Sequence, residues 1–303
     1  MTHIKSRTLL KMALLFTTLY TGITASQGLF AADFEMPDKL KVCADPYMLP
    51  FSNNEEQGYE NKIAELFAKE MGLELEYTWF PQRMGFVRNT LKKEVSSSSG
   101  KYACDLIMDV PSDFELAATT KPYYTTSYVL VFARGHGLDG LTDANSLGEY
   151  ARKNKPDLKF GLADRGPQQI WVVYQDLIGN IVPFQGMPGD VKVHPGKKMI
   201  DSIVSGDIDA AIVWGPTAGY YAKQYSDEAD LVLLHLPDQD RRNRELKFTY
   251  SMSMAVRYGE NEWKQKINQL IDENREEIHK ILTDYGVPLV EKSTTEETTT
   301  DSE

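Results

Sequence analysis

The 303-residue sequence lacks several short motifs that mark enzymes and metal sites. It contains no HExxH, no GxSxG and no Walker sequence. Its five histidines are scattered along the chain, and Asp207 and Asp209 are not followed by the glycine and glutamate that complete a calcium-binding loop. We therefore predict a protein with no catalysis of its own, no bound metal and no cofactor.

Basic residues are few relative to acidic ones. The chain has 33 lysines and arginines against 44 aspartates and glutamates, and its formal net charge is −11. Nucleic acids and anionic lipid surfaces are bound through basic surfaces. The charge therefore argues against a nucleic-acid partner and against membrane binding. It is compatible with a cationic partner, or simply with the acidity common among secreted proteins.

Long apolar runs are confined to the N-terminal segment. Three basic residues, Lys5, Arg7 and Lys11, precede the apolar stretch 12–20, and small residues follow it. This order is typical of a secretory signal, and the stretch is too short to span a bilayer. We predict that 1–32 is a signal peptide that directs the chain to the periplasm; a membrane anchor is the alternative.

Cysteine is scarce, with only Cys43 and Cys104 present. Both fall in predicted strands, and cysteines on neighbouring strands can pair in an oxidising compartment. Their separation and the absence of a CxxC motif argue against a metal site. We predict a disulfide between them, with two buried thiols as the alternative.

The first hundred residues after the signal alternate between strand and helix patterns. Strands are predicted at 40–44, 73–79 and 105–110, and helices at 59–71 and 81–92. This alternation indicates a mostly parallel sheet covered by helices, which is an α/β fold.

The rest of the chain repeats this organisation. A long aromatic and β-branched run at 123–133 suits a strand that leaves one lobe and enters the next, and a second α/β unit follows it. A returning strand is predicted at 248–256 and a long amphipathic helix at 262–282. The acidic tail, 291–303, contains no apolar residue and is predicted to be disordered.

The order of these elements resembles solute-binding protein family 3, which has the type II periplasmic binding protein fold. The matching strings include TKPYYTTSYVLVFA, IVSGDIDAAIVWGPTAGYY and FTYSMSMAVRYGENEW. The resemblance implies two α/β lobes with two crossover strands as a hinge. We predict lobe 1 at 33–131 plus 244–290 and lobe 2 at 132–243.

Within that family the sequence is similar to the MxaJ/MoxJ and XoxJ proteins. The strings that carry this similarity are ADPYMLPFSNN, GYENKIAELFAKEMG, YTWFPQRMGFVRNTL and CDLIMDVP. The resemblance implies a periplasmic accessory protein in methanol utilization that aids maturation or activation of a PQQ-dependent methanol dehydrogenase, its protein partner. The alternative is a substrate-binding receptor of an ABC importer for a small polar solute. Because some members of this fold are enzymes, an enzyme is a third hypothesis.

The residues that hold an amino acid in related receptors are missing here. Such receptors bind the ligand carboxylate with an arginine just before the PYY segment and the amine with an acid after the strand of the second lobe. At the first of these places the sequence has residues 112–116, which include no arginine. At the second place it has Trp214. A zwitterion in such a cleft would lose both charge partners.

Loops at the carboxyl ends of the predicted strands face the crevice in this class of fold. Simpler interpretations exist: the tryptophans can be core residues, Asp45 can cap a turn, Arg83 can pair with surface acids, and Arg165 can simply open a helix. The predicted cleft and partner-binding residues are Asp45, Pro46, Phe51, Trp79, Gln82, Arg83, Asp109, Arg165, Gln168, Trp214 and Tyr220.

Overall fold

A computed structural model describes residues 36–96, 100–164, 166–240 and 242–291. The predicted signal peptide, Arg165 and the tail beyond Glu291 lie outside the described residues. Within the described ranges, no helix is both long and apolar enough to cross a membrane.

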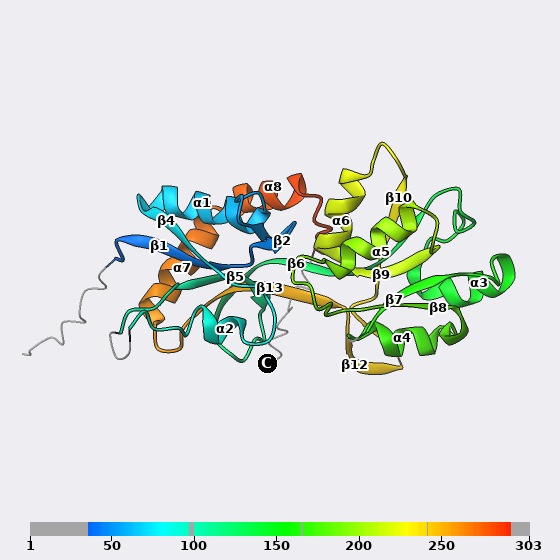
Figure 1. The fold of residues 1–303 in the computed structure, drawn as a ribbon, viewed down its shortest axis with the longest axis horizontal. Helices are drawn as coiled ribbons and strands as arrows, with labels where there is room; N and C mark the ends of the chain where they lie inside the picture. The colour runs from blue at the N-terminus through cyan, green and yellow to red at the C-terminus, as the bar shows by residue number, and fades with distance from the viewer. Residues whose placement is uncertain (1–35, 97–99, 165, 241, 292–303) are drawn as a thin grey trace, which may run out of the picture. The chain divides into compact units, whose positions relative to one another are not determined.

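The fold is a mixed α/β arrangement around a nine-stranded sheet, ordered β4-β1-β5-β13-β6-β9-β7-β8 with β10 also paired to β6 (Figure 1). Pairing is parallel within β4-β1-β5 and within β9-β7-β8, and antiparallel where β13 and β6 join these groups. The strands of this sheet are β1 (Lys39–Ala44), β4 (Glu74–Trp79), β5 (Leu106–Pro111), β6 (Ala118–Ala133), β7 (Phe160–Ala163), β8 (Ile181–Phe184), β9 (Ala210–Trp214), β10 (Leu231–His235) and β13 (Thr249–Val256).

Two short hairpins and eight α-helices complete the described fold. The hairpins are β2 (Tyr47–Met48) with β3 (Ser52–Asn53), and β11 (Gln239–Asp240) with β12 (Asn243–Lys247). The helices are α1 (Tyr59–Met71), α2 (Phe86–Asn89), α3 (Leu147–Asn154), α4 (Gln168–Tyr174), α5 (Pro195–Val204), α6 (Gly215–Gln224), α7 (Asn261–Glu273) and α8 (Arg275–Asp284), with 3₁₀ turns η1 (Ala144–Ser146) and η2 (Ile178–Asn180).

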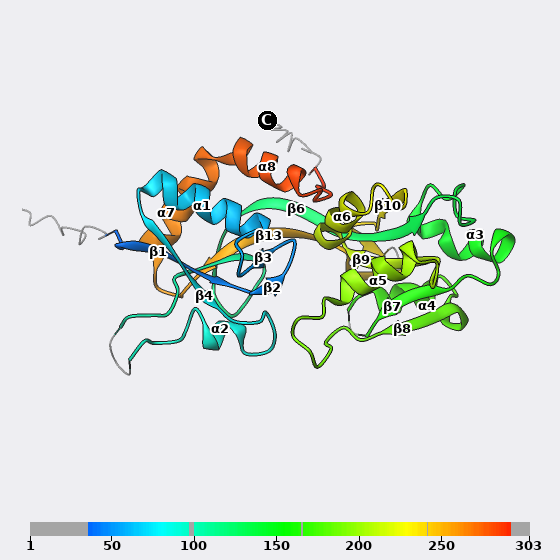
Figure 2. The same cartoon turned by 45° about the horizontal axis from the view of Figure 1, so that its top comes forward.

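Strand β6 belongs to both halves of the sheet. Its first half pairs with β13, for example Tyr124 with Met252, and its second half pairs with β9 and β10, for example Tyr128 with Trp214. Figure 2 shows β6 and β13 running side by side between the two groups of helices. These strands are the two crossovers that the sequence predicts.

Alternation along the strands places apolar side chains on both faces of the sheet. In β6, Leu130 and Phe132 pack into a core with α3 and α4, whereas Val129 and Val131 pack into a core with α5 and α6. We call this part the second lobe. The first lobe is built in the same way from β1, β4, β5 and most of β13, with α1, α7 and α8 on one face and the α2 segment on the other.

Two predicted helices are interrupted. The helix expected over 81–92 is only the four-residue α2, because Gly85 adopts a left-handed conformation (φ 90°) that ends any extension toward the N-terminus. The helix expected over 262–282 is divided into α7 and α8 at Asn274, whose side-chain amide donates to the Leu270 carbonyl. The lobe boundaries at 131/132 and 243/244 remain predictions, and Phe248, beyond the second boundary, packs with the second lobe.

Candidate binding cleft at the crossover strands

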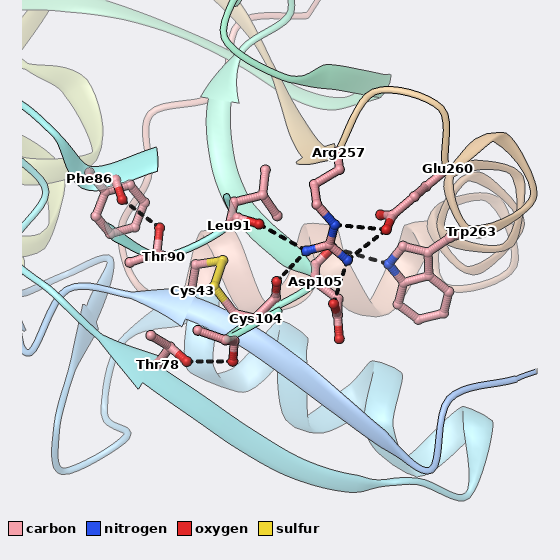
Figure 3. Close-up of a disulfide and its surroundings, with 11 residues drawn as sticks. Cys43, Thr78, Phe86, Thr90, Leu91, Cys104, Asp105, Arg257, Glu260 and Trp263 are labelled. Atoms are coloured by element: carbon pink, nitrogen blue, oxygen red, sulfur yellow. Dashed lines mark hydrogen bonds and ion pairs between the residues drawn. A yellow bond between two sulfur atoms is a disulfide. The ribbon is translucent and has the colours of Figure 1, made fainter. Parts of the chain in front are cut away.

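The predicted disulfide between Cys43 and Cys104 is present, with a Cα–Cα distance of 5.4 Å (Figure 3). Cys43 lies in β1 and Cys104 just before β5, and these strands are parallel neighbours. Cys43 faces away from α1 because its neighbours Val42 and Ala44 enter the core on the other face. The bond therefore fixes the strand that leads into Asp45.

A buried arginine lies beside this disulfide. Arg257 donates to the carbonyls of Leu91 and Cys104, at 3.0 and 2.6 Å, and forms ion pairs with Asp105 and Glu260 (Figure 3). A buried guanidinium is tolerated when its donors are satisfied in this way. The cluster holds the α2 segment, β5 and the start of α7 together.

Asp45 organises the loop that follows β1. It is 2% exposed, and its carboxylate accepts backbone hydrogen bonds from Tyr47 and Gln82. Burial raises the pKa of this carboxyl, and the two backbone donors and nearby Arg83 oppose that shift. Asp45 therefore positions Gln82 and the β2–β3 hairpin and is not itself exposed to a ligand.

A cavity of about 340 Å³ lies between the lobes next to the crossovers. Four of the predicted residues line it: Phe51 and Gln82 from the first lobe, and Gln168 and Trp214 from the second. The other lining residues are Met48, Tyr128, Ala163, Asp164, Gly186, Met187, His194, Pro195, Gly196, Met199, Ile212, Val213 and Thr217.

The lining of this cavity is aromatic and thioether-rich. Trp214 lies between Tyr128 and Tyr250, with ring centroids 5.0 and 5.7 Å apart, and burial raises the pKa of Tyr128 to about 12. Asp164 is the single carboxylate among the lining residues, and one of its oxygens accepts from the Gly186 N–H. No arginine or lysine is among the lining residues that the structure describes. The cavity suits an uncharged, mainly apolar group.

His194 is a cleft residue that the sequence analysis missed. It is the N-cap of α5, and its Nδ1 accepts from the Lys197 N–H at 3.3 Å. This bond assigns the ring proton to Nε2, and burial lowers the pKa of His194 to about 4. The ring is therefore neutral near pH 7. Its position directly before Pro195 at the first turn of a helix was the available sequence signal.

Arg83 connects the lobes beside the cavity. Its guanidinium donates to the carbonyls of Pro188 and Asp190, at 2.6 and 3.0 Å. Lys192 in the same loop lies over the ring of Tyr47, 5.4 Å from its centroid. Arg83 thus meets backbone oxygens of the opposite lobe and forms no ion pair with a surface acid among the described residues.

Three further predicted residues, Trp79, Tyr220 and Pro46, are not among the described residues that line the cavity. The ring of Trp79 stacks on that of Tyr77, with a centroid distance of 4.6 Å. The ring of Tyr220 stacks on that of Tyr285, with a centroid distance of 6.1 Å. Pro46 lies in the turn after β1, where its carbonyl accepts from the Asn54 N–H at 3.2 Å. The place of Arg165 is outside the described residues.

Asp109 is buried below the cleft and is 5% exposed. The hydroxyls of Tyr59 and Tyr124 both donate to its Oδ2 at 2.8 Å. Burial raises the pKa of Asp109 to about 6, although the two hydrogen bonds oppose the shift. This carboxyl is part of the first-lobe core.

The glycines Gly135, Gly137 and Gly140 have the GxGxxG spacing of dinucleotide-binding sites. Such a site needs a parallel strand that leads directly into a helix. Here the glycines follow β6, which is antiparallel to both β9 and β10, and the next helical turn starts only at Ala144. The segment is a turn in which Asp139 accepts from the Gly135 N–H at 2.7 Å.

The fold and the position of the cavity define a type II periplasmic binding protein. An ancestral arginine-binding protein bound to glutamine matches 84% of this chain and 100% of its own, with a TM-score of 0.52 and 18% identity; this likeness shows the fold alone. No family model matches the sequence.

The chain belongs to the MxaJ/MoxJ–XoxJ family. It is 30% identical to the periplasmic binding protein XoxJ from Methylobacterium extorquens AM1, over 84% of this chain and 100% of that one, with a TM-score of 0.64. It is 25% identical to the protein MoxJ of Paracoccus denitrificans over 84% of this chain and 90% of that protein. MxaJ from Methylophaga aminisulfidivorans MPT shares the fold, with 24% identity, a TM-score of 0.68 and coverage of 83% and 100%.

Proposed function

We propose that this protein is a non-catalytic periplasmic accessory protein that aids the maturation or activation of a PQQ-dependent methanol dehydrogenase. It uses the cleft beside the crossover strands to bind a segment or surface of that enzyme. Membership in the MxaJ/MoxJ–XoxJ family supports the link to methanol oxidation and the periplasmic location.

The chemistry of the cavity is the observation that carries this proposal. Among the described residues that line it there is one exposed carboxylate, Asp164, and no cationic side chain. These described residues offer no guanidinium to the carboxylate of a bound amino acid, and an unpaired carboxylate is costly in a partly dehydrated site. An apolar side chain of a protein partner, by contrast, finds Phe51, Met187, Met199 and Trp214 around it.

The test compares two matched surface variants. Met187 lines the cavity and is 51% exposed, and Ile178 is 61% exposed and does not line it. We expect the wild-type protein and Ile178→Glu to associate with the purified dehydrogenase, and Met187→Glu to associate at least tenfold more weakly. A deletion strain should lose dehydrogenase activity and regain it with Ile178→Glu but not with Met187→Glu. Absence of association, together with full activity in the deletion strain, would refute the proposal.

A transport receptor is the competing function, because amino-acid-binding proteins share this fold. A receptor would be stabilised by its solute, by an amount that depends on the ratio of concentration to dissociation constant. A thermal-shift series with amino acids, polyamines and organic acids therefore separates the two functions. A clear rise of the melting temperature with one of these solutes would favour the receptor.

A further inference from the structure

A second concave surface lies on the first lobe, outside the cavity between the lobes. It has a volume of about 430 Å³ and runs between the α2 segment and the loop after β5. Gln82 is the only lining residue that it shares with the cavity. We call this surface the α2 groove; its lining residues are Gln82, Arg83, Met84, Gly85, Phe86, Val87, Arg88, Lys92, Ile107, Asp109, Val110, Pro111, Phe114 and Leu116.

The sequence of the α2 segment explains why the groove is cationic. Phe86, Val87 and Leu91 are buried against the disulfide and β5, which leaves Met84, Arg88 and Lys92 exposed. Gly85 prevents a longer helix, so no further helical turn packs beside α2. The side chains of Met84, Arg88 and Lys92 therefore border an open groove.

The cations of the groove form no ion pair with acids in the described part of the chain. Arg83, Arg88 and Lys92 take part in none of the ion pairs formed among the described residues. Asp109 is the only acid in the lining, and it is buried and bonded to two tyrosines. A protein with a net charge of −11 therefore presents a locally positive groove.

Large apolar side chains are exposed at the same place. Met84 is 89% exposed and Leu116 is 56% exposed, and Phe114 is only partly buried. Tyr258, 62% exposed, extends the patch: Lys92 lies over its ring and its hydroxyl donates to the Glu115 carbonyl at 2.9 Å. Apolar surface bordered by unpaired cations is the arrangement expected at a protein interface.

We propose that the α2 groove is a docking surface for an acidic polypeptide segment that carries apolar anchor residues. The apolar anchors occupy the space between Met84, Phe114 and Leu116, and carboxylates of the segment pair with Arg88 and Lys92. Arg83 is already engaged with the carbonyls of Pro188 and Asp190, so it contributes less. Charge complementarity favours an acidic protein segment, and the negative charge of the rest of the chain disfavours nucleic acid and anionic lipid, which present extended arrays of phosphates.

The binding test uses fluorescein-labelled ten-residue peptides and the full chain. The first peptide carries aspartates around a Phe-Leu pair, the second replaces the aspartates by lysines, and the third replaces the Phe-Leu pair by Gly-Ser. We expect only the first to raise the fluorescence anisotropy at micromolar protein, and its binding to weaken several-fold when NaCl rises from about 20 to about 200 mM.

Variants identify the surface. Arg88→Glu with Lys92→Glu should weaken the acidic peptide at least tenfold, and Leu116→Ser should weaken it about fivefold. The control is Lys69→Glu with Lys198→Glu, which changes the net charge equally at two exposed lysines outside the groove and should leave binding within twofold. Circular dichroism confirms that each variant is folded.

The outcomes also separate this inference from the proposed function. Equal binding of the acidic and lysine peptides, or unchanged binding by Arg88→Glu with Lys92→Glu, would overturn the docking surface. Neither result affects the association with the dehydrogenase through the cavity, which Met187→Glu tests. Binding of the acidic peptide without any association with the dehydrogenase would retain the docking surface and reject the proposed partner.

Discussion

At the residue scale, two buried titratable groups respond to pH in opposite directions. Burial raises the pKa of Asp109 to about 6 and lowers the pKa of His194 to about 4. In both cases the cause is that the folded protein disfavours the charged form. The destabilisation by Asp109 therefore grows between about pH 4 and pH 6 and persists above it, whereas that by His194 grows as the pH falls from about 6.5 to 4 and persists below it.

Asp109→Asn tests the first group. Its folded pKa lies above the unfolded value of 3.8, so between about pH 4 and pH 6 the folded state binds more protons and stability falls as the pH rises. We expect Asp109→Asn to reduce this slope and to gain stability relative to the wild type, by up to about 3 kcal/mol at pH 7. Buried Glu60, whose pKa is also raised by burial and by the charge of Asp109, accounts for the slope that remains. Urea unfolding at pH 4.5, 5.5 and 7 measures it. The exposed control Asp113→Asn should follow the wild type, and a constant difference between Asp109→Asn and wild type at all three values would contradict the assignment.

His194→Asn tests the second group while preserving an N-cap acceptor for α5. The folded pKa lies below the unfolded value of 6.5, so the unfolded state binds more protons between about pH 4 and 6.5, and stability is lost as the pH falls through this range. The variant should lack this loss, which is on the order of 2 to 3 kcal/mol in the wild type. His194→Ala should additionally lose about 1 kcal/mol at pH 7 because it removes the cap. Identical acid sensitivity of wild type and His194→Asn would show that the ring is not held neutral.

At the element scale, the first lobe depends on a covalent bond between β1 and the start of β5. The disulfide joins two cysteines that are 61 positions apart in the sequence, and the segment between them contains α1, β4 and the α2 segment. Loss of the disulfide raises the conformational entropy of the unfolded chain. It also removes the covalent restraint on Cys104, whose carbonyl accepts from Arg257. The groove and the Asp45 turn both rest on these elements.

Cys43→Ala with Cys104→Ala should therefore destabilise the protein by about 4 kcal/mol, mainly through the entropy of the unfolded chain. Urea unfolding with and without reductant checks this value. The wild type in reductant should approach the double variant, and the double variant itself should not respond to reductant. A wild type that keeps its full stability after complete reduction would contradict the expectation.

At the scale of the whole molecule, the contact between the lobes beside the cavity depends on Arg83. Arg83→Ala removes the two hydrogen bonds to the 186–192 loop. We expect amide hydrogen exchange in this loop to accelerate about three- to tenfold, with little change in β1 or β9. Lys153→Ala, at an exposed ion pair of α3, serves as the control. Unchanged exchange in the loop would show that Arg83 does not restrain it.

Much of this architecture could be predicted from the sequence, because periodicity and breakers are local. Helix α1 and strands β1, β5 and β6 follow from apolar spacing, and Gly72 closes α1 in the left-handed conformation (φ 66°). The division at Asn274 could not be predicted, because the apolar face continues across it. Strand β8 was missed since it has four residues and contains Pro183.

The cleft was harder to predict than the fold. Strand ends suggested Phe51, Gln82 and Trp214, which line the cavity, but the same rule also selected Asp45 and Asp109, whose side chains turn inward to buried partners. The local sequence does not distinguish a strand-end side chain that points into the cavity from one that points into the core. That orientation depends on tyrosine hydroxyls and backbone N–H groups from distant segments. Met187 and His194 were overlooked for the same reason: a loop and a helix start bring them to the cavity only after the second lobe has folded.

The sixteen-residue strand β6 supplies hydrogen-bonding edges to β13, β9 and β10 at once. Neither lobe is therefore a transplantable module. If the gene is divided between the lobes, one product has an unpaired sheet edge and the other lacks its central strand. In a chimaera with a relative, a lobe can be exchanged only if both crossover strands come from the same parent.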